Sequence, residues 1–333
     1  MGAVRYFLAL AVLLSHMGIS VGDMNPGVVA VVVFYALAGH VVYMLMTKFQ
    51  SASSWSGLLS FYKDRFWRIY PLYFIGLILA VFLWIHGANS HFISKPPNTL
   101  DWLSNLSVIP LNFFMFSGQD QFTLIPPAWS LGLEIQFYIL APFILKIDKK
   151  LRNLIFFSSF LLFLLAQYNL FNSDTYGYRL LPGTLFIFML GMTCHQLTSR
   201  DRHLLLGFLA LTGAGIFFFA TYYGIVRPFV RETSLGLLLS VIVLSLHKQN
   251  FYILERGLGA KTLRHISKSM GSASYGLFIL HFSVIWWVDL YYGNTFLFSP
   301  LGIISVIILT TLLALILNAF IEKPIWKRSR PRV

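Results

Sequence analysis

The feature that most constrains this chain is a series of ten apolar runs, most of them long enough to cross a membrane. A membrane-spanning helix needs about 20 mainly apolar residues, and lipid offers no partners to the backbone, so each spanning run must be helical. The sequence therefore predicts an all-α polytopic membrane protein with about ten transmembrane helices. The runs lie at 4–21, 27–47, 69–86, 128–145, 154–171, 180–197, 204–223, 233–247, 273–291 and 300–321.

The composition agrees with a membrane protein and excludes other classes. Charged residues make up 11% of the chain, against about 25% in soluble domains. The net charge of +13 does not indicate a nucleic-acid partner, because the cations lie in short segments between apolar runs, as in membrane proteins. Cys194 is the single cysteine, which excludes an internal disulfide, and we expect no metal site.

The distribution of cations predicts the topology. With ten spans and both termini in the cytoplasm, all but four of the 25 Lys and Arg residues lie on the cytoplasmic side, as the positive-inside rule requires. An eleventh span at 100–116 would move every later loop to the opposite side and make the distribution far less one-sided. The four cations left outside are Lys95, Arg179, Arg227 and Arg231.

The segment 87–127 is accordingly predicted to be one long external segment. Its apolar part, 100–116, is interrupted by polar residues and Pro110, so we expect it to lie in the membrane interface or to re-enter the membrane. An ordered loop of this length is a candidate substrate lid. We expect a single membrane domain over 1–322 and a basic cytoplasmic tail over 323–333, with the first run retained and no soluble domain attached.

Two polar residues share one face of the first predicted helix. Arg5 and His16 are eleven residues apart, which is three turns plus about 20°, and about 16 Å along the axis. Polar side chains on one stripe of a membrane helix usually face a cavity or the interior of the bundle. A topology anchor for Arg5 and a packed core histidine for His16 are the structural alternatives.

Depth relates His16 to a carboxylate on another helix. His16 and Glu134 both fall roughly 7 to 9 Å below the predicted outer surface. A carboxylate in lipid needs a partner, so we expect Glu134 to pair with His16 and to orient it as a general base. Glu134 could instead join two helices structurally. His281 lies near the middle of the ninth run and could line the same cavity.

A second cluster lies at the predicted inner face. Arg65 and Arg68 are three residues apart, just before the third run, and two guanidinium groups there suit a phosphate-bearing ligand. A topology pair bound to lipid phosphates is the alternative.

Together these segments resemble the acyltransferase-3 family of integral-membrane acyltransferases, which O-acetylate bacterial surface glycans. The first helix has the family's Arg-x10-His spacing, and five later segments follow in the family's order. These are FYALAGHVV at 34–42, with Ala38 where serine is usual, RFWRIYP at 65–71, AWSLGLEIQFY at 128–138, SYGLFILH at 274–281 and EKP at 322–324.

The resemblance implies an enzyme of a bacterial inner membrane that uses cytoplasmic acetyl-CoA, or another acyl-CoA, and an external acceptor. The acceptor would be a saccharide or a lipid-linked glycan such as lipopolysaccharide or another polysaccharide. His16 would act as the base, with Glu134 and Arg5 as further catalytic residues, and Arg65 and Arg68 would bind the donor's phosphates. Ser130, Tyr275 and His281 are candidates for contacting the substrate. Because no esterase-like domain follows, the acyl group could also pass to a separate partner protein.

Two other functions compete with this one. A transporter or glycolipid flippase could use the intramembrane histidines and Glu134 as a proton relay, although the chain shows no related halves. A polyprenyl-phosphate glycosyltransferase would need paired external carboxylates, and those of this chain are scattered.

The predicted topology can be tested by labelling. Cysteines introduced singly into 117–127 and 146–152 should react with a membrane-impermeant reagent from opposite sides of the membrane. Labelling of both from the same side would overturn the ten-span topology.

Overall fold

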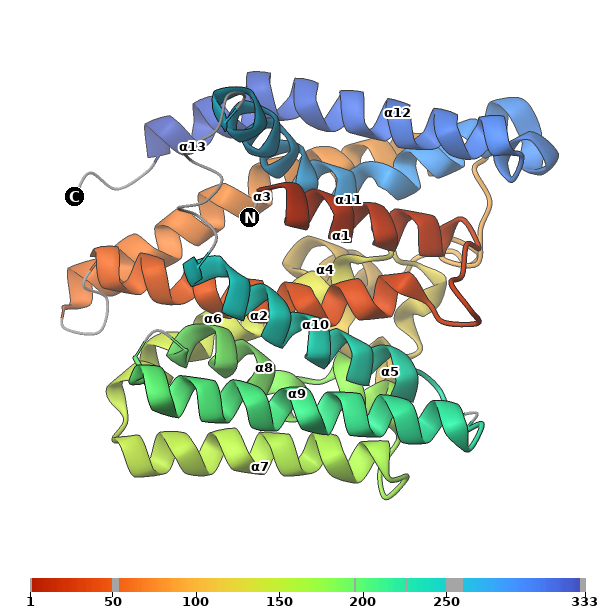
Figure 1. Ribbon diagram of the computed structural model, residues 1–333. Coiled ribbons are helices and arrows are strands. Elements are labelled where there is room, and N and C mark those ends of the chain that lie inside the picture. The colour runs from red at the N-terminus through yellow and green to blue at the C-terminus, as the bar shows by residue number, and fades with distance from the viewer. Residues whose placement is uncertain (1, 50–53, 195, 226, 250–259, 330–333) are drawn as a thin grey trace. The chain divides into compact units, whose positions relative to one another are not determined.

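A computed structural model describes residues 2–49, 54–194, 196–225, 227–249 and 260–329, and the regular elements within these ranges are helices (Figure 1). By their contacts these residues form two compact units, each assembled from separate stretches of chain. Unit 1 comprises Met1–Met17, Ser60–Ile135 and Ile266–Val333, and unit 2 comprises Gly18–Leu59 and Gln136–His265. Because the stretches interleave along the chain, this division does not test the expected single domain over 1–322.

Each predicted run overlaps a helix. Unit 1 contains α1 (Gly2–His16), most of α3 (Trp55–Ile85), α4 (Thr99–Ser107), η1 (Ile109–Phe113), α5 (Phe114–Ser117), η2 (Gln119–Gln121), the start of α6 (Ala128–Lys146), most of α11 (Ala260–Leu297), α12 (Pro300–Leu317), η4 (Asn318–Glu322) and α13 (Lys323–Ser329). Unit 2 contains α2 (Pro26–Phe49), the rest of α6, α7 (Lys149–Gln167), η3 (Thr175–Arg179), α8 (Leu181–Thr193), α9 (Ser199–Tyr222) and α10 (Val230–Gln249).

The all-α polytopic membrane fold is confirmed. Within the described ranges, seven helices are long and apolar enough to cross a membrane: α2, α3, α6, α7, α9, α11 and the continuous stretch from α12 to α13. The 20-residue α10 is not among these seven, and α1 and α8 are shorter, with 15 and 13 residues, so the number ten stays a prediction. Of the expected tail at 323–333, residues 323–329 form α13, and 330–333 lie outside the described residues.

Unit 2 is a bundle whose helices approach closely at glycines. Gly39 of α2 lies against the carbonyl of Phe188 in α8, and Gly191 of α8 lies against the carbonyl of Ala36, so neither position has room for a Cβ. Small residues allow membrane helices to pack backbone to backbone. The side chains of Asp148 and Thr198 cap the N-termini of α7 and α9.

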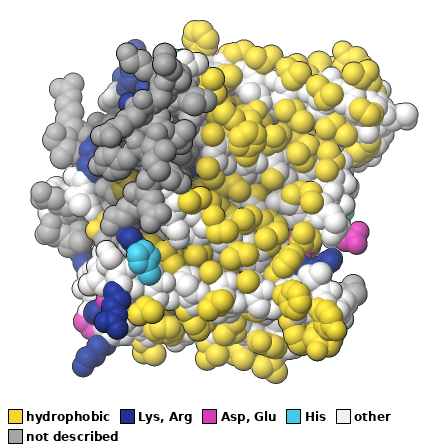
Figure 2. Space-filling view, in the orientation of Figure 1, with side chains coloured by type: hydrophobic (Ala, Val, Ile, Leu, Met, Phe, Trp, Pro, Cys, Tyr) yellow, Lys and Arg dark blue, Asp and Glu magenta, His cyan; other side chains and the backbone are white. Residues whose placement is uncertain are grey.

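The surface of unit 2 has the pattern of a protein embedded in lipid. Hydrophobic side chains cover α7 and α9 along their length, and Lys and Arg side chains gather where both helices begin (Figure 2). The predicted topology requires this, because it places 146–152 and 200–202 on the same side of the membrane. The exposed apolar residues include Leu154, Phe157 and Leu161 of α7, and Leu204, Phe208, Leu211 and Phe218 of α9.

Unit 1 is organised around α11, which contacts three other helices. Near the start of α11, Ser267 Oγ accepts a hydrogen bond of 3.2 Å from the Ala3 amide of α1, and Gly271 lies against Gly2. Further along, Gly276 packs on Ala314 of α12, and Gly76 of α3 packs on Ile279. Figure 1 shows α1 alongside α11 and α12, and Tyr6 of α1 reaches Thr311 of α12 with a hydrogen bond of 2.8 Å.

The segment 100–116 does not form a continuous spanning helix. It breaks at Val108, whose φ is 70° and whose amide closes the last turn of α4. Its amphipathicity is inverted: Leu100, Leu103, Leu106, Phe113 and Phe116 are exposed, whereas Asp101, Ser104, Asn105 and Asn112 are fully buried. Exposed apolar and buried polar side chains are typical of a segment that contacts lipid, as expected for an interfacial or re-entrant piece.

The close approach of α1 to α11 generates a stability prediction. A Cβ added at Gly271 would lie 2.7 Å from Gly2 Cα, so Gly271→Ala must push the helices apart, at a cost of about 1–3 kcal/mol. We expect a lower unfolding temperature in detergent. Gly215→Ala is the control, because nothing lies within 4 Å of that added Cβ. Equal stability of the two variants would contradict the close packing.

Candidate functional site

Two histidines from α1 and α11 meet in unit 1. His16 Nδ1 lies 3.0 Å from His281 Nε2. The ring centroids are 5.1 Å apart with the planes 18° from parallel, which is close to the largest separation that this N···N distance allows. The rings therefore meet edge to edge through one N–H···N hydrogen bond, rather than face to face.

The two histidines differ in access. His16, the last residue of α1, is partly exposed, whereas His281 is fully buried. The ring of Phe282 packs on His16 with 4.8 Å between centroids. His16 is therefore the more accessible of the two residues.

The long segment 87–127 approaches this pair. Phe92 packs edge-on against Phe282 with 5.3 Å between centroids, so the segment is one aromatic ring away from His16. The Thr123 amide donates to Phe92 O at 2.7 Å and holds the two ends of the segment together. This placement fits the predicted lid.

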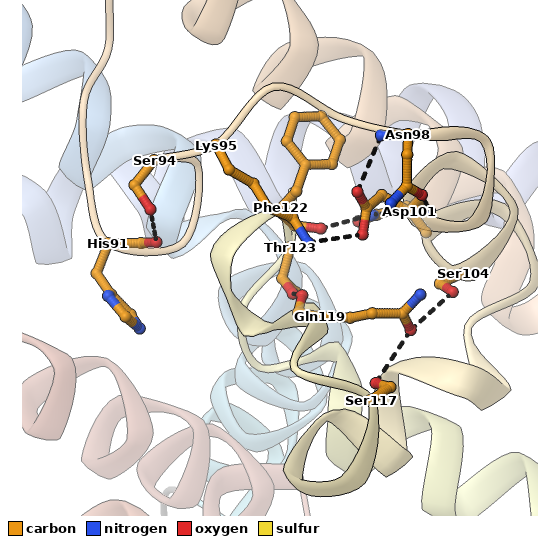
Figure 3. Close-up of polar contacts among 11 residues, drawn as sticks. His91, Ser94, Lys95, Asn98, Asp101, Ser104, Ser117, Gln119, Phe122 and Thr123 are labelled. Atoms are coloured by element: carbon orange, nitrogen blue, oxygen red, sulfur yellow. Dashed lines mark hydrogen bonds and ion pairs between the residues drawn. The ribbon is translucent and has the colours of Figure 1, made fainter.

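Buried polar contacts give the segment its shape. Asn98 and Asp101 form a capping box at the start of α4, and Lys95 Nζ lies 3.2 Å from Asp101 Oδ1. Gln119 Oε1 accepts from Ser104 and Ser117 at 3.1 and 3.3 Å (Figure 3). An ordered network of this kind holds a surface in one shape.

Asn105 joins α4 to its neighbours. Its side-chain amide donates to Asp101 O and Phe122 O, its Oδ1 accepts from the Leu124 amide at 2.8 Å, and its carbonyl accepts from Tyr73 of α3 at 2.7 Å. One buried residue thus fixes the segment to α3.

The expected pairing of His16 with Glu134 is replaced in the structure. The hydrogen bond of His16 goes to His281. The sequence placed His281 at mid-membrane by counting residues within its run, whereas the parallel packing of α1 and α11 brings it level with His16. Glu134 lies in the second turn of α6 and is partly buried, and its catalytic role stays a prediction.

The two predicted donor-binding arginines are each paired with a buried carboxylate. Arg68 forms an ion pair with Glu322 of η4, and the two side chains are 28% and 2% exposed. The Arg68 guanidinium also lies 5.7 Å from the centre of the Tyr275 ring. Arg65 Nη2 is 2.6 Å from Asp64 Oδ2, and Asp64 is fully buried.

The remaining predicted residues are held by local bonds. Ser130 Oγ donates to Pro127 O at 3.0 Å, and Tyr275 Oη donates to Ile69 O at 2.9 Å. In this conformation the hydroxyl protons of both residues are directed at backbone carbonyls, and their contact with the substrate stays a prediction. Arg5 lies near the start of α1, at the end where α1 meets Ser267 of α11.

Sequence reasoning missed the partners rather than the polar residues themselves. Glu322 appears in the EKP segment, and the rule that a carboxylate in a membrane helix needs a cation could have suggested Arg68. Phe92 and Phe282 carried no signal, because aromatic residues are abundant throughout the chain. Within the described residues, no cluster of three or more His, Cys, Asp or Glu side chains could hold a metal ion.

Comparison with known proteins gives two matches. A family model described as an acyltransferase domain matches residues 1–319. An uncharacterized protein of Aquifex aeolicus (strain VF5) is 35% identical over 170 residues, which cover 49% of this chain and 71% of that protein. No solved structure matches.

The Arg68–Glu322 pair predicts an asymmetry in stability. Arg68→Gln leaves a carboxylate unpaired that is only 2% exposed, so we expect a loss of about 3 kcal/mol, at the low end for breaking a buried ion pair. Glu322→Gln leaves a more exposed guanidinium and should cost less. Thermal unfolding in detergent measures both, with Arg200→Gln at an exposed position of α9 as control. The opposite order would contradict the pairing.

Proposed function

We propose that this chain, which belongs to the acyltransferase-3 family of integral-membrane acyltransferases, transfers an acyl group from acyl-CoA to a saccharide hydroxyl. The donor would be acetyl-CoA or a close relative bound at the cytoplasmic side. The acceptor would be a cell-surface or lipid-linked glycan on the far side of a bacterial inner membrane. Family membership favours an acyltransferase over the transporter alternative.

The proposal rests on the hydrogen bond and the accessibility of His16. One ring nitrogen, Nδ1, lies 3.0 Å from His281, which leaves Nε2 for a reacting molecule, and His16 as a whole residue is partly exposed. A general base must be held in one orientation and remain accessible to the proton that it takes. His16 meets both requirements.

The proposed reaction is a direct transfer. The acceptor hydroxyl loses its proton to His16 Nε2 while its oxygen attacks the acyl carbon of the thioester. The carbon–sulfur bond then breaks, and the thiolate of CoA leaves and takes up the proton that His16 holds. No covalent acyl-enzyme is needed, although transfer through a separate partner protein would use the same base.

The arginine cluster supports donor binding. Arg68 keeps 28% of its side chain exposed beside Glu322. A guanidinium is a planar group with five N–H donors, a shape that binds phosphate oxygens bidentately. Tyr275 and His281 are six residues apart on α11, or roughly 9 Å along its axis. An extended thioester arm bound near Arg68, with Arg65 and Arg5 as further phosphate ligands, would run along α11 toward His16.

The experiment that tests the function compares the surface glycans of cells expressing the wild-type protein with those of cells expressing His16→Ala. We expect mass spectrometry to show the loss of one acyl substituent per modified sugar in the variant alone. Purified wild-type protein should also hydrolyse acetyl-CoA slowly in detergent, which a transporter would not do. His203→Ala, at an exposed position of α9, is the matched control.

The mass that is lost identifies the acyl group. Unchanged glycans, with the His16→Ala protein present in the membrane, would overturn the assignment of His16 as the base.

A further inference from the structure

We propose that His281 is a positioning residue that holds His16 in the tautomer with its proton on Nδ1 and its lone pair on Nε2. The inference rests on the proposed function for its consequence, because a base needs that lone pair. The tautomer itself follows from two hydrogen bonds and from the burial of His281.

The first step concerns His281 alone. Its Nδ1 lies 3.1 Å from the carbonyl oxygen of Leu277, one turn earlier in α11. A carbonyl oxygen can only accept, so Nδ1 of His281 carries a proton. A neutral imidazole has one N–H, so Nε2 of His281 carries the lone pair.

The second step determines which histidine donates the hydrogen bond between the two rings. Because Nε2 of His281 accepts, the hydrogen bond of 3.0 Å must be donated by Nδ1–H of His16. Neutral His16 then has its lone pair on Nε2. The backbone of α11 thus determines which nitrogen of a residue on α1 is basic.

Burial keeps this arrangement from reversing. His281 is fully buried in a membrane helix, where a charged imidazole would be costly. A proton added to Nε2 of His281 would turn it into a donor and force the other tautomer on His16. Because His281 stays neutral, its Nε2 remains an acceptor throughout the reaction.

The consequence for acyl transfer is that a neutral histidine, rather than a carboxylate, accepts the hydrogen bond from Nδ1 of the base. When His16 takes the acceptor's proton on Nε2, both of its nitrogens are protonated, and Nδ1–H still donates to His281. The neutral acceptor stabilises the imidazolium. In hydrolases with a Ser-His-Asp triad, a carboxylate has this role, and an arrangement that imposes the wrong tautomer costs about 10⁴-fold in rate.

Two amides of different length test the role of His281. In His281→Gln, the side-chain oxygen can reach the position of Nε2 and accept from His16. In His281→Asn, the amide ends near the position of Nδ1, so it can still donate to Leu277 but cannot reach His16. We expect Asn to lower kcat for acyl transfer by roughly 10²-fold or more, with KM for acyl-CoA unchanged, and Gln to retain most of the activity.

Equal activity of the Asn and Gln variants would overturn the proposal. It would show that activity does not depend on whether the side chain at position 281 can hydrogen-bond to His16. His281→Leu, which has neither a donor nor an acceptor, should be as inactive as Asn. The amount of folded protein, measured by size-exclusion chromatography in detergent, must be the same in each variant that is compared.

A measurement without substrate separates the tautomer from the function. In protein labelled with ¹⁵N-histidine, the His16 signals, identified by their absence from His16→Ala, should show a protonated Nδ1 and an unprotonated Nε2. The His281→Asn variant should lose this preference. A protonated Nε2 in the wild type would overturn the proposal even if the protein is active. The expected tautomer in a protein without transferase activity would support the inference and count against the proposed function.

Discussion

The structure depends on the rule that a polar group inside a membrane needs a partner within the protein. Unit 1 satisfies this rule repeatedly. Arg68 has Glu322, His16 has His281, and buried Asn105 uses both ends of its side chain and its carbonyl. Each of these contacts joins segments that are far apart in the sequence. The requirement for partners therefore decides which helices lie together, as well as which side chains face inward.

The helix that provides most of these contacts is α11. Glycines along it let α1, α3 and α12 approach closely, and its polar side chains lie between them at fixed levels. Tyr275 stands beside Arg68, and His281 stands beside His16 about two turns further on. A single rigid helix thus sets the distance between the proposed donor site and the proposed base, which suits a reaction that must align a bound thioester with an attacking hydroxyl.

The histidine pair is suited to its environment. A carboxylate next to a histidine in a partly buried site would have to be desolvated, and its charge would persist through the whole catalytic cycle. Two neutral imidazoles avoid that cost before proton transfer, and only one charge develops during the reaction. The segment 87–127, fixed by its own buried polar network, reaches the neighbourhood of this pair through the contact of Phe92 with Phe282.

Much of this protein could be predicted from the sequence because membranes impose local rules. Length and hydropathy located the long apolar helices, and the distribution of cations argued against 100–116 as an eleventh span. The spacing of Arg5 and His16, and of Arg65 and Arg68, identified polar faces from helical periodicity alone. The partners were decided only by tertiary structure, since depth counted along one run ignores how far a neighbouring helix is shifted along its axis. Glu134 and His16 share a predicted level, yet the parallel packing of α1 on α11 at Gly2 and Gly271 brings His281 to His16 instead. Helix periodicity is a property of one segment, whereas the shift between two helices depends on the side chains of both.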